Sequence, residues 1–108
     1  MNRQWYYDIN TKPISHEEWC KLCEDPIYRT INKDWIGPYN ISTMWMGLNH
    51  NIFPDVPLIF ETMIFCENKD DELYLYQDRC SDLEQAYEMH DIATELCRET
   101  LKKREENV

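Results

Sequence analysis

Hydrophobic residues in the middle of the chain form two apolar segments, residues 39–48 and 58–65. In the first segment both alternating sets of positions are largely apolar, and in the second only Glu61 and Thr62 interrupt the pattern. Segments of this kind are typical of strands that lie inside a sheet with both faces covered. We therefore expect residues 39–48 to form a central strand and residues 58–65 to form another.

Three further segments are rich in β-branched and aromatic residues, which favour strands. They are residues 5–9, 27–35 and 73–76. Turn-forming residues separate neighbouring segments, for example Gly37-Pro38 and the polar residues 68–71. Short connections of this kind join antiparallel strands, so the pattern predicts a β-meander.

A short helix is predicted over about residues 16–24. Ser15 and Glu18 have the spacing of a capping box, in which each side chain accepts a hydrogen bond from a backbone amide near the start of the helix. Asp25-Pro26 is expected to end this helix, because the residue before a proline is pushed out of the helical region.

The last quarter of the chain predicts a long helix that ends near Lys103. Ser81 and Glu84 form a second capping box. Acidic residues near its start and basic residues near its end suit the helix dipole. Apolar residues and one histidine recur at helical spacing and form a stripe that needs a surface to pack on. The stripe consists of Leu83, Ala86, Tyr87, His90, Ala93, Cys97 and Leu101.

Together these elements predict an α+β fold. Four to five antiparallel strands form a meander, the long C-terminal helix packs on one face of it, and the short helix lies near the N-terminus. No linker-like segment divides the chain, so residues 1–108 are expected to form a single domain whose last few residues fray.

The formal net charge of −10 bears on the choice of partners. Residues 1–54 carry five Lys or Arg and six Asp or Glu, whereas residues 55–108 carry six and fifteen. An acidic surface repels nucleic acid and anionic membranes, so we expect neither direct nucleic-acid binding nor membrane binding. The charge either serves solubility or competes for a basic partner, such as a nucleic-acid-binding protein.

The five cysteines are expected to be free thiols in a cytoplasmic protein, or in the host cytoplasm if a phage encodes the chain. Their number is odd, and neither an export segment nor a membrane-length apolar run is present. Cys20 and Cys23 have the spacing of half a zinc site, but they lie within the predicted helix, so we expect core thiols and no metal site. The chain has only two glycines and lacks a phosphate-cradling loop, so no cofactor is expected.

Glu61 and His90 are the first candidates for a functional pair. His90 lies on the apolar stripe of the long helix and Glu61 interrupts an apolar strand, so both are expected to face the core. A carboxylate and an imidazole withdrawn from water are expected to pair, since an unpaired buried charge is costly. Such a pair either fixes the helix on the sheet or acts as an acid/base or ligand-gripping pair at the edge of the core.

His50, Ser42 and Thr43 are further candidates for a ligand-binding site. His50 lies in a loop between two strands, and loops at strand ends are where sites concentrate. Ser42 and Thr43 are adjacent hydroxyls that face opposite sides of a strand, where they either line a polar pocket or bond to their neighbours. No Gly-x-Ser-x-Gly motif surrounds Ser42, so a serine hydrolase is not supported.

The aromatic residues leave a choice between core and site. Most are expected in the core, but Trp35, Tyr39 and Trp45 together would also suit a pocket that stacks on a nucleobase. Trp45 therefore completes the predicted ligand-binding set.

Several motifs in fixed order carry a resemblance to a known family. They are Trp5-Tyr-Tyr-Asp8, Pro13-Ile-Ser-His-Glu-Glu-Trp19, Tyr28-Arg29-Thr30, Ser42-Thr43-Met-Trp45-Met-Gly47-Leu48-Asn49-His50, Pro57-Leu-Ile-Phe60-Glu61-Thr62-Met63-Ile-Phe65, and Arg79 through Glu84 with Ala86 and His90. In these motifs, which span most of the chain, the sequence resembles a family of small uncharacterised proteins frequent in bacteriophages, prophages and their hosts. Two positions depart from the family's pattern: the loop after His50 is not glycine-rich, and Met89 precedes His90 where glycine is common.

The resemblance implies a phage-type accessory protein and no particular reaction. The leading hypothesis is a non-catalytic binding or inhibitory factor with an anti-defence role, acting on a host protein or a small nucleotide-like signal. A hydrolase-like enzyme using His50, Glu61 and His90 is the second hypothesis. The third is a structural subunit that self-associates, for example as a homodimer, through a sheet edge.

Overall fold

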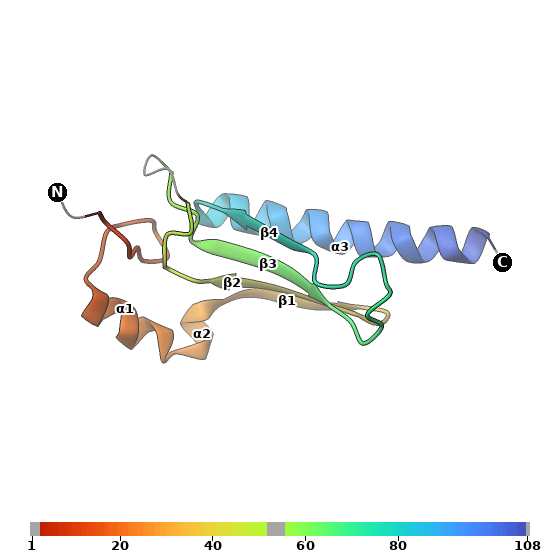
Figure 1. Ribbon diagram of the computed structural model, residues 1–108, viewed down its shortest axis with the longest axis horizontal. Helices are drawn as coiled ribbons and strands as arrows, with labels where there is room; N and C mark the ends of the chain where they lie inside the picture. The colour runs from red at the N-terminus through yellow and green to blue at the C-terminus, as the bar shows by residue number, and fades with distance from the viewer. Residues whose placement is uncertain (1–2, 52–55, 108) are drawn as a thin grey trace.

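The computed structural model describes residues 3–51 and 56–107. In this part of the chain a four-stranded antiparallel sheet, in the order β1-β2-β3-β4, lies against one long helix, and two short helices precede it (Figure 1). The elements are α1 (His16–Cys23), α2 (Pro26–Arg29), β1 (Thr30–Ile36), β2 (Tyr39–Trp45), β3 (Phe60–Phe65), β4 (Gln77–Cys80) and α3 (Leu83–Glu106). The predicted α+β fold is therefore confirmed.

A tight turn joins β1 to β2. Ile36 pairs with Tyr39, so Gly37 and Pro38 form a two-residue connection. Gly37 has a φ of 55°, which glycine adopts without steric cost. A glycine at the first central position suits a hairpin turn whose twist matches that of the strands. β2 then pairs with β3 without a register shift, which makes these two strands the centre of the sheet.

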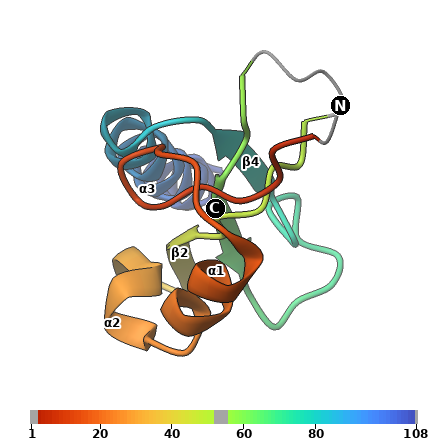
Figure 2. The ribbon, with the colours of Figure 1, turned by 90° about the vertical axis from the view of Figure 1, so that its left-hand side faces the viewer.

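The long helix α3 packs along one face of the sheet (Figure 2). It begins where Asp82 accepts a 2.8 Å hydrogen bond from the backbone amide of Gln85. Its buried positions face the strands, whereas Tyr87, predicted for this stripe, is 48% exposed and Met89 is buried instead. The two short helices lie at the end of the sheet where β2 finishes (Figure 1).

The apolar core between α3 and the sheet is divided into two clusters. One lies near the β1–β2 turn and the other near the short helices. The first contains Tyr39, Ile41, Ile64, Leu73, Ala93 and Cys97. The second contains Trp45, Ile59, Phe60, Cys80, Ala86 and Met89. Three fully buried polar residues, Thr43, Thr62 and His90, separate the two clusters. Each of them lies between members of the two clusters along its own strand or helix.

The predicted strand over residues 27–35 begins later than expected. Residues 27–29 belong to α2, because Asp25 caps this short helix by accepting hydrogen bonds from the amides of Ile27 and Tyr28. Pro26 occupies the first helical turn, where its missing N–H is not needed. Asp25-Pro26 thus ends α1, as predicted, and also starts a second helix.

The predicted strand over residues 73–76 is wrong. These residues form a turn in which Leu75 has a φ of 57°, and the fourth strand begins only at Gln77. The Asp71 carboxylate accepts a 2.9 Å hydrogen bond from the Leu73 amide and so stabilises the turn. Leu73 is buried against the core, which explains the apolar character of a segment that is not a strand.

The N-terminal segment does not join the sheet as a further strand. Its strand-type pairings are isolated bridges, between Tyr6 and Leu48 and between Tyr7 and Pro13. β2 is central, as expected, and none of its residues is exposed. The neighbouring strands are less covered on the face opposite α3, where Trp35 of β1 and Phe65 of β3 are 70% and 43% exposed.

Candidate functional site

The six residues predicted for a ligand-binding site do not form one cluster, because side chains alternate between the two faces of a strand. Three lie on the side that α3 covers and three belong to the opposite side. The covered set is Thr43, Trp45 and His90. The other set is Ser42, Glu61 and His50.

On the covered side, His90 lies in a chain of hydrogen bonds. Its Nε2 donates to Asp34 Oδ2 at 2.7 Å, since a carboxylate only accepts, and its Nδ1 lies 2.7 Å from Thr43 Oγ1. Thr43 in turn shares a hydrogen bond with the hydroxyl of Thr62, its direct partner across the strands. In the neutral ring, Nδ1 accepts from Thr43, and Thr43 then accepts from Thr62.

This series of hydrogen bonds resembles a nucleophile–histidine–carboxylate arrangement, but no substrate reaches it. Thr43, Thr62 and His90 are all fully buried. Asp34 alone among the four extends into solvent, with 48% of its side chain exposed. These hydrogen bonds therefore connect α3 to β1, β2 and β3, and they do not present an accessible hydroxyl.

The predicted pairing of Glu61 with His90 is wrong. Glu61 Oε2 accepts hydrogen bonds from Arg79 Nε at 3.0 Å and from Gln77 Nε2 at 2.6 Å, on the face opposite α3. Thr62, the next residue of β3, is the one that faces the helix. The partner of His90 is Asp34, which sequence reasoning missed because no pattern in the β1 segment marks it as inward-facing.

On the open side, His50 lies in the electrostatic field of the Glu61–Arg79 ion pair. Burial and the positive charge of Arg79 lower the pKa of His50, and Glu61 partly opposes this. Its Nε2 is buried and has no hydrogen-bond partner among the described residues. His50 therefore lies near enough to Glu61 and Arg79 to respond to their charges, whereas His90 lies beneath α3.

Ser42 belongs to the same face but is not available to a ligand. It is 7% exposed and lies between its strand partners Lys33 and Met63. Trp45 is fully buried at the other side, where Tyr28 packs edge-on against its ring and its Nε1 donates to the Tyr7 carbonyl. Trp45 is therefore a core residue.

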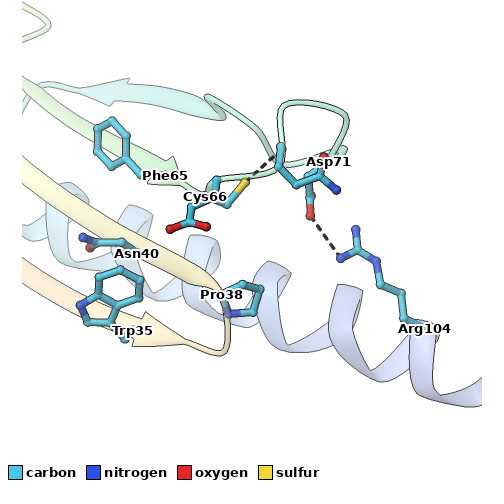
Figure 3. Close-up of a pocket in the computed structure, with 9 residues that line it drawn as sticks. Trp35, Pro38, Asn40, Phe65, Cys66, Asp71 and Arg104 are labelled. Atoms are coloured by element: carbon cyan, nitrogen blue, oxygen red, sulfur yellow. Dashed lines mark hydrogen bonds and ion pairs between the residues drawn. The ribbon is translucent and has the colours of Figure 1, made fainter.

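A cleft of about 780 Å³ opens at the end of the sheet next to the β1–β2 turn (Figure 3). Its floor is a row of three side chains from neighbouring strands, and its far wall comes from the β3–β4 connection and the last turns of α3. The lining residues are Trp35, Pro38, Asn40, Phe65, Cys66, Glu67, Asn68, Asp71 and Arg104.

The floor of the cleft combines exposed aromatic rings with a buried amide oxygen. Trp35 pairs with Asn40 across the strands, and Asn40 pairs with Phe65, so the three side chains stand in line (Figure 3). With strands about 4.8 Å apart, the backbones at Trp35 and Phe65 are separated by roughly 10 Å. Asn40 Oδ1 is buried and has no hydrogen-bond partner among the described residues.

The wall of the cleft is a polar network around Asp71. Tyr39 donates from its hydroxyl to Asp71 at 2.8 Å, and Arg104 Nη1 donates to the Tyr39 hydroxyl at 2.8 Å and to Asp71 at 3.2 Å. Burial, together with the hydrogen bond to Asp71, raises the pKa of Tyr39 to about 12. Burial acts to raise the pKa of Asp71, but hydrogen bonds from Leu73, Arg104 and Tyr39 outweigh it and lower that pKa.

Sequence reasoning found only part of this cleft. Trp35 and Tyr39 were singled out as aromatic candidates. Trp35 does line the floor, and the Tyr39 hydroxyl is hydrogen-bonded to Asp71 and Arg104 of the wall. Asn40, Phe65 and Arg104 were missed. The available signal was the pair of aromatic residues on the same face of β1 and β3, which becomes visible only when the register of the strands is known.

The cysteines contribute no cluster to either face. Burial raises the pKa of Cys80 and of Cys97 to about 11. Cys20 Sγ lies 3.6 Å from a ring nitrogen of His16, one helical turn away. Within residues 3–51 and 56–107, no three potential metal ligands gather at one place.

The described helices include none that is long and apolar enough to cross a membrane.

Comparison with known proteins adds no relative: no protein-family model, curated protein or solved structure matches this chain.

Proposed function

We propose that this chain is a non-catalytic binding protein that holds its target in the cleft at the open face of the sheet. The observation that carries the proposal is the row of Trp35, Asn40 and Phe65, in which two exposed rings flank a buried oxygen without a partner. Exposed aromatic residues around an unsatisfied polar group are typical of ligand and protein interfaces. The cavity volume of about 780 Å³ lies in the usual range for such sites.

The arrangement of the histidines favours binding over catalysis. A hydrolase built from His50, Glu61 and His90 needs all three within reach of one substrate. His90 is fully buried beneath α3 and bonded to Thr43 and Asp34, whereas Glu61 lies on the opposite face. The three residues therefore do not act on a common ligand.

The biological setting of the proposal comes from the resemblance to phage-type proteins. A phage-type accessory protein acts on a host system, and an acidic binding protein suits the role of an inhibitor that occupies the site of a host partner. We propose this inhibitory role, in the host cytoplasm, as the function of the cleft.

The experiment is a comparative pull-down from a bacterial lysate, with mass spectrometry of the retained proteins and small molecules. The bait is the wild-type chain, the double variant Trp35→Ser/Phe65→Ser, or Ile92→Ser as a matched control. Ile92 is also an exposed apolar residue, at 63%, but it lies on α3 away from the cleft.

We expect the wild type and Ile92→Ser to retain the same target, and the double variant to lose it. A target that the double variant retains equally well contradicts a role for the cleft. If the retained species is a second copy of the chain, the face is a dimer interface, and sedimentation of the wild type against the double variant shows this directly.

A further inference from the structure

The charged and polar groups of the cleft are only partly paired with one another. Asn40 Oδ1 is an acceptor without a partner, and the carboxylate of Glu67, which also lines the cleft, has no ion pair among the described residues. The one cation among the lining residues, Arg104, is already bonded to Asp71 and Tyr39 and lies 3.6 Å from Glu72. The Glu67 carboxylate is therefore the charged group of the cleft lining that has no ion-pair partner among the described residues.

The charge around the cleft selects for a cation. The connection between β3 and β4 carries Glu67, Asp70, Asp71 and Glu72 against Lys69 alone. Arg104 offsets Asp71, so an excess of negative charge remains at the rim. An anionic ligand such as a nucleotide would meet repulsion here, because no cation in the lining is free to bind its phosphates.

The aromatic floor distinguishes between cations. A guanidinium is flat, stacks on the face of an indole ring and directs its N–H donors sideways in its own plane. Trp35 and Asn40 are direct partners across the strands, roughly 5 Å apart. A guanidinium stacked on Trp35 therefore lies next to the Asn40 side chain, whereas a compact ammonium group cannot stack in this way.

We propose that the cleft binds an arginine side chain presented by an extended basic segment of a partner protein. The proposal rests on the proposed binding function and names the chemistry of its target. The guanidinium stacks on Trp35, next to the Asn40 side chain, and Glu67 neutralises its charge. The cleft is larger than one guanidinium, so flanking residues of the segment occupy the space beside Phe65.

The test uses the full chain and synthetic probes. They are an eight-residue peptide of alternating Arg and Ser, the same peptide with Lys in place of Arg, and a dinucleotide as an anionic probe. Binding is measured by isothermal titration calorimetry at about 150 mM salt, where long-range attraction to the acidic surface is screened. The side-chain NMR signals of Asn40 and Trp35 report on the site itself.

We expect the Arg peptide to bind more tightly than the Lys peptide and to shift both NMR signals. Trp35→Ser should weaken its Kd roughly five- to thirtyfold, as loss of a cation–π contact does. Glu67→Gln should weaken binding more than Glu88→Gln, which changes the charge equally at an exposed position of α3. Thermal melts check that each variant is folded. We expect Trp35→Ser to fold, because 70% of the Trp35 surface is exposed.

Equal binding of the Arg and Lys peptides, with no effect of Trp35→Ser, overturns the proposal and leaves non-specific attraction. Preferential binding of the dinucleotide also overturns it and indicates a nucleotide-like ligand. These results are separate from the pull-down. If the lysate target depends on Trp35 and Phe65 but the Arg peptide does not bind, the binding function stands and the arginine chemistry is wrong.

Discussion

Asp34 and His90 stand 56 residues apart in the chain, and a 2.7 Å hydrogen bond joins Asp34 Oδ2 to His90 Nε2. Through Thr43 and Thr62, the same imidazole is connected to β2 and β3. Apolar contacts alone allow a helix to slide on a sheet, because they have no preferred direction. The hydrogen bonds of His90 do have a direction, and we infer that they set the position of α3 along the sheet.

Replacing His90 with alanine is expected to destabilise the fold strongly. The change removes one of the two partners of the buried Thr43 hydroxyl, leaving only Thr62, and creates a cavity between the two core clusters. Together these effects correspond to about 3–5 kcal/mol, measured by urea denaturation. Asp34→Ala is expected to cost much less, because 48% of the Asp34 side chain is exposed. A His90→Ala variant as stable as the wild type would contradict the role of this hydrogen-bond chain.

Gly47→Ala is expected to be more damaging than Gly37→Ala. Both glycines have positive φ, 70° and 55°, so both changes strain the backbone. A methyl group at Gly47 would also overlap the rings of Trp45 and Trp19, whereas at Gly37 it would meet only the end of the flexible Leu101 side chain. We expect a loss of about 2–4 kcal/mol for Gly47→Ala and about 1–2 kcal/mol for Gly37→Ala. Thermal melts followed by circular dichroism rank the two variants, and the reverse order would show that the ring packing yields easily.

The titration of His50 is expected to respond to its two charged neighbours in opposite directions. Arg79 lowers the pKa of His50 and Glu61 raises it. Arg79→Gln should therefore move the NMR titration midpoint of His50 upward, and Glu61→Gln should move it downward. An unchanged midpoint in both variants would show that His50 does not lie near this ion pair.

The lowered pKa of His50 also predicts a pH dependence of stability. The unfolded chain binds a proton at His50 more readily than the folded chain does, because burial and Arg79 disfavour the charged ring. Stability should therefore fall as the pH drops below about 6.5, the ordinary pKa of histidine. His50→Gln is expected to remove this component of the pH dependence in urea denaturation between pH 7 and pH 5.

Asp71 is expected to contribute stability that acid removes. Hydrogen bonds from Leu73, Arg104 and Tyr39, opposed by burial, give the Asp71 carboxyl a lowered pKa in the folded state. The contribution is complete above the unfolded pKa of about 3.9 and is lost as the pH falls through the folded value. The stability difference between wild type and Asp71→Asn should therefore be larger at pH 7 than at pH 3. An equal difference at both values would assign the effect of the variant to packing.

Sequence patterns predicted the two central strands and the long helix, because apolar residues repeat with a clear period in these segments. They failed where an apolar segment serves a different purpose. Leu73 is apolar because it covers the core from a turn, and residues 27–29 are helical because Asp25 caps them locally. Periodicity detects burial, and it does not distinguish a buried turn from a buried strand.

The candidate site shows the same division. From the sequence, Glu61 and Thr62 were equally good interruptions of an apolar strand, since both faces of that strand are largely apolar. Which of the two meets His90 depends on which face α3 covers. The helix covers the face of Thr62, so Glu61 lies on the other face and forms an ion pair with Arg79.

Local period, capping residues and composition are properties of the sequence, and they are sufficient to predict the two central strands, the long helix and the acidic character of the chain. Which strand positions share a row, and which face of the sheet stays open, depends on the tertiary structure. Strand register places Trp35, Asn40 and Phe65 in line, and the position of α3 leaves that row exposed. Register and helix position arise from contacts between residues far apart in the chain, which no local pattern specifies.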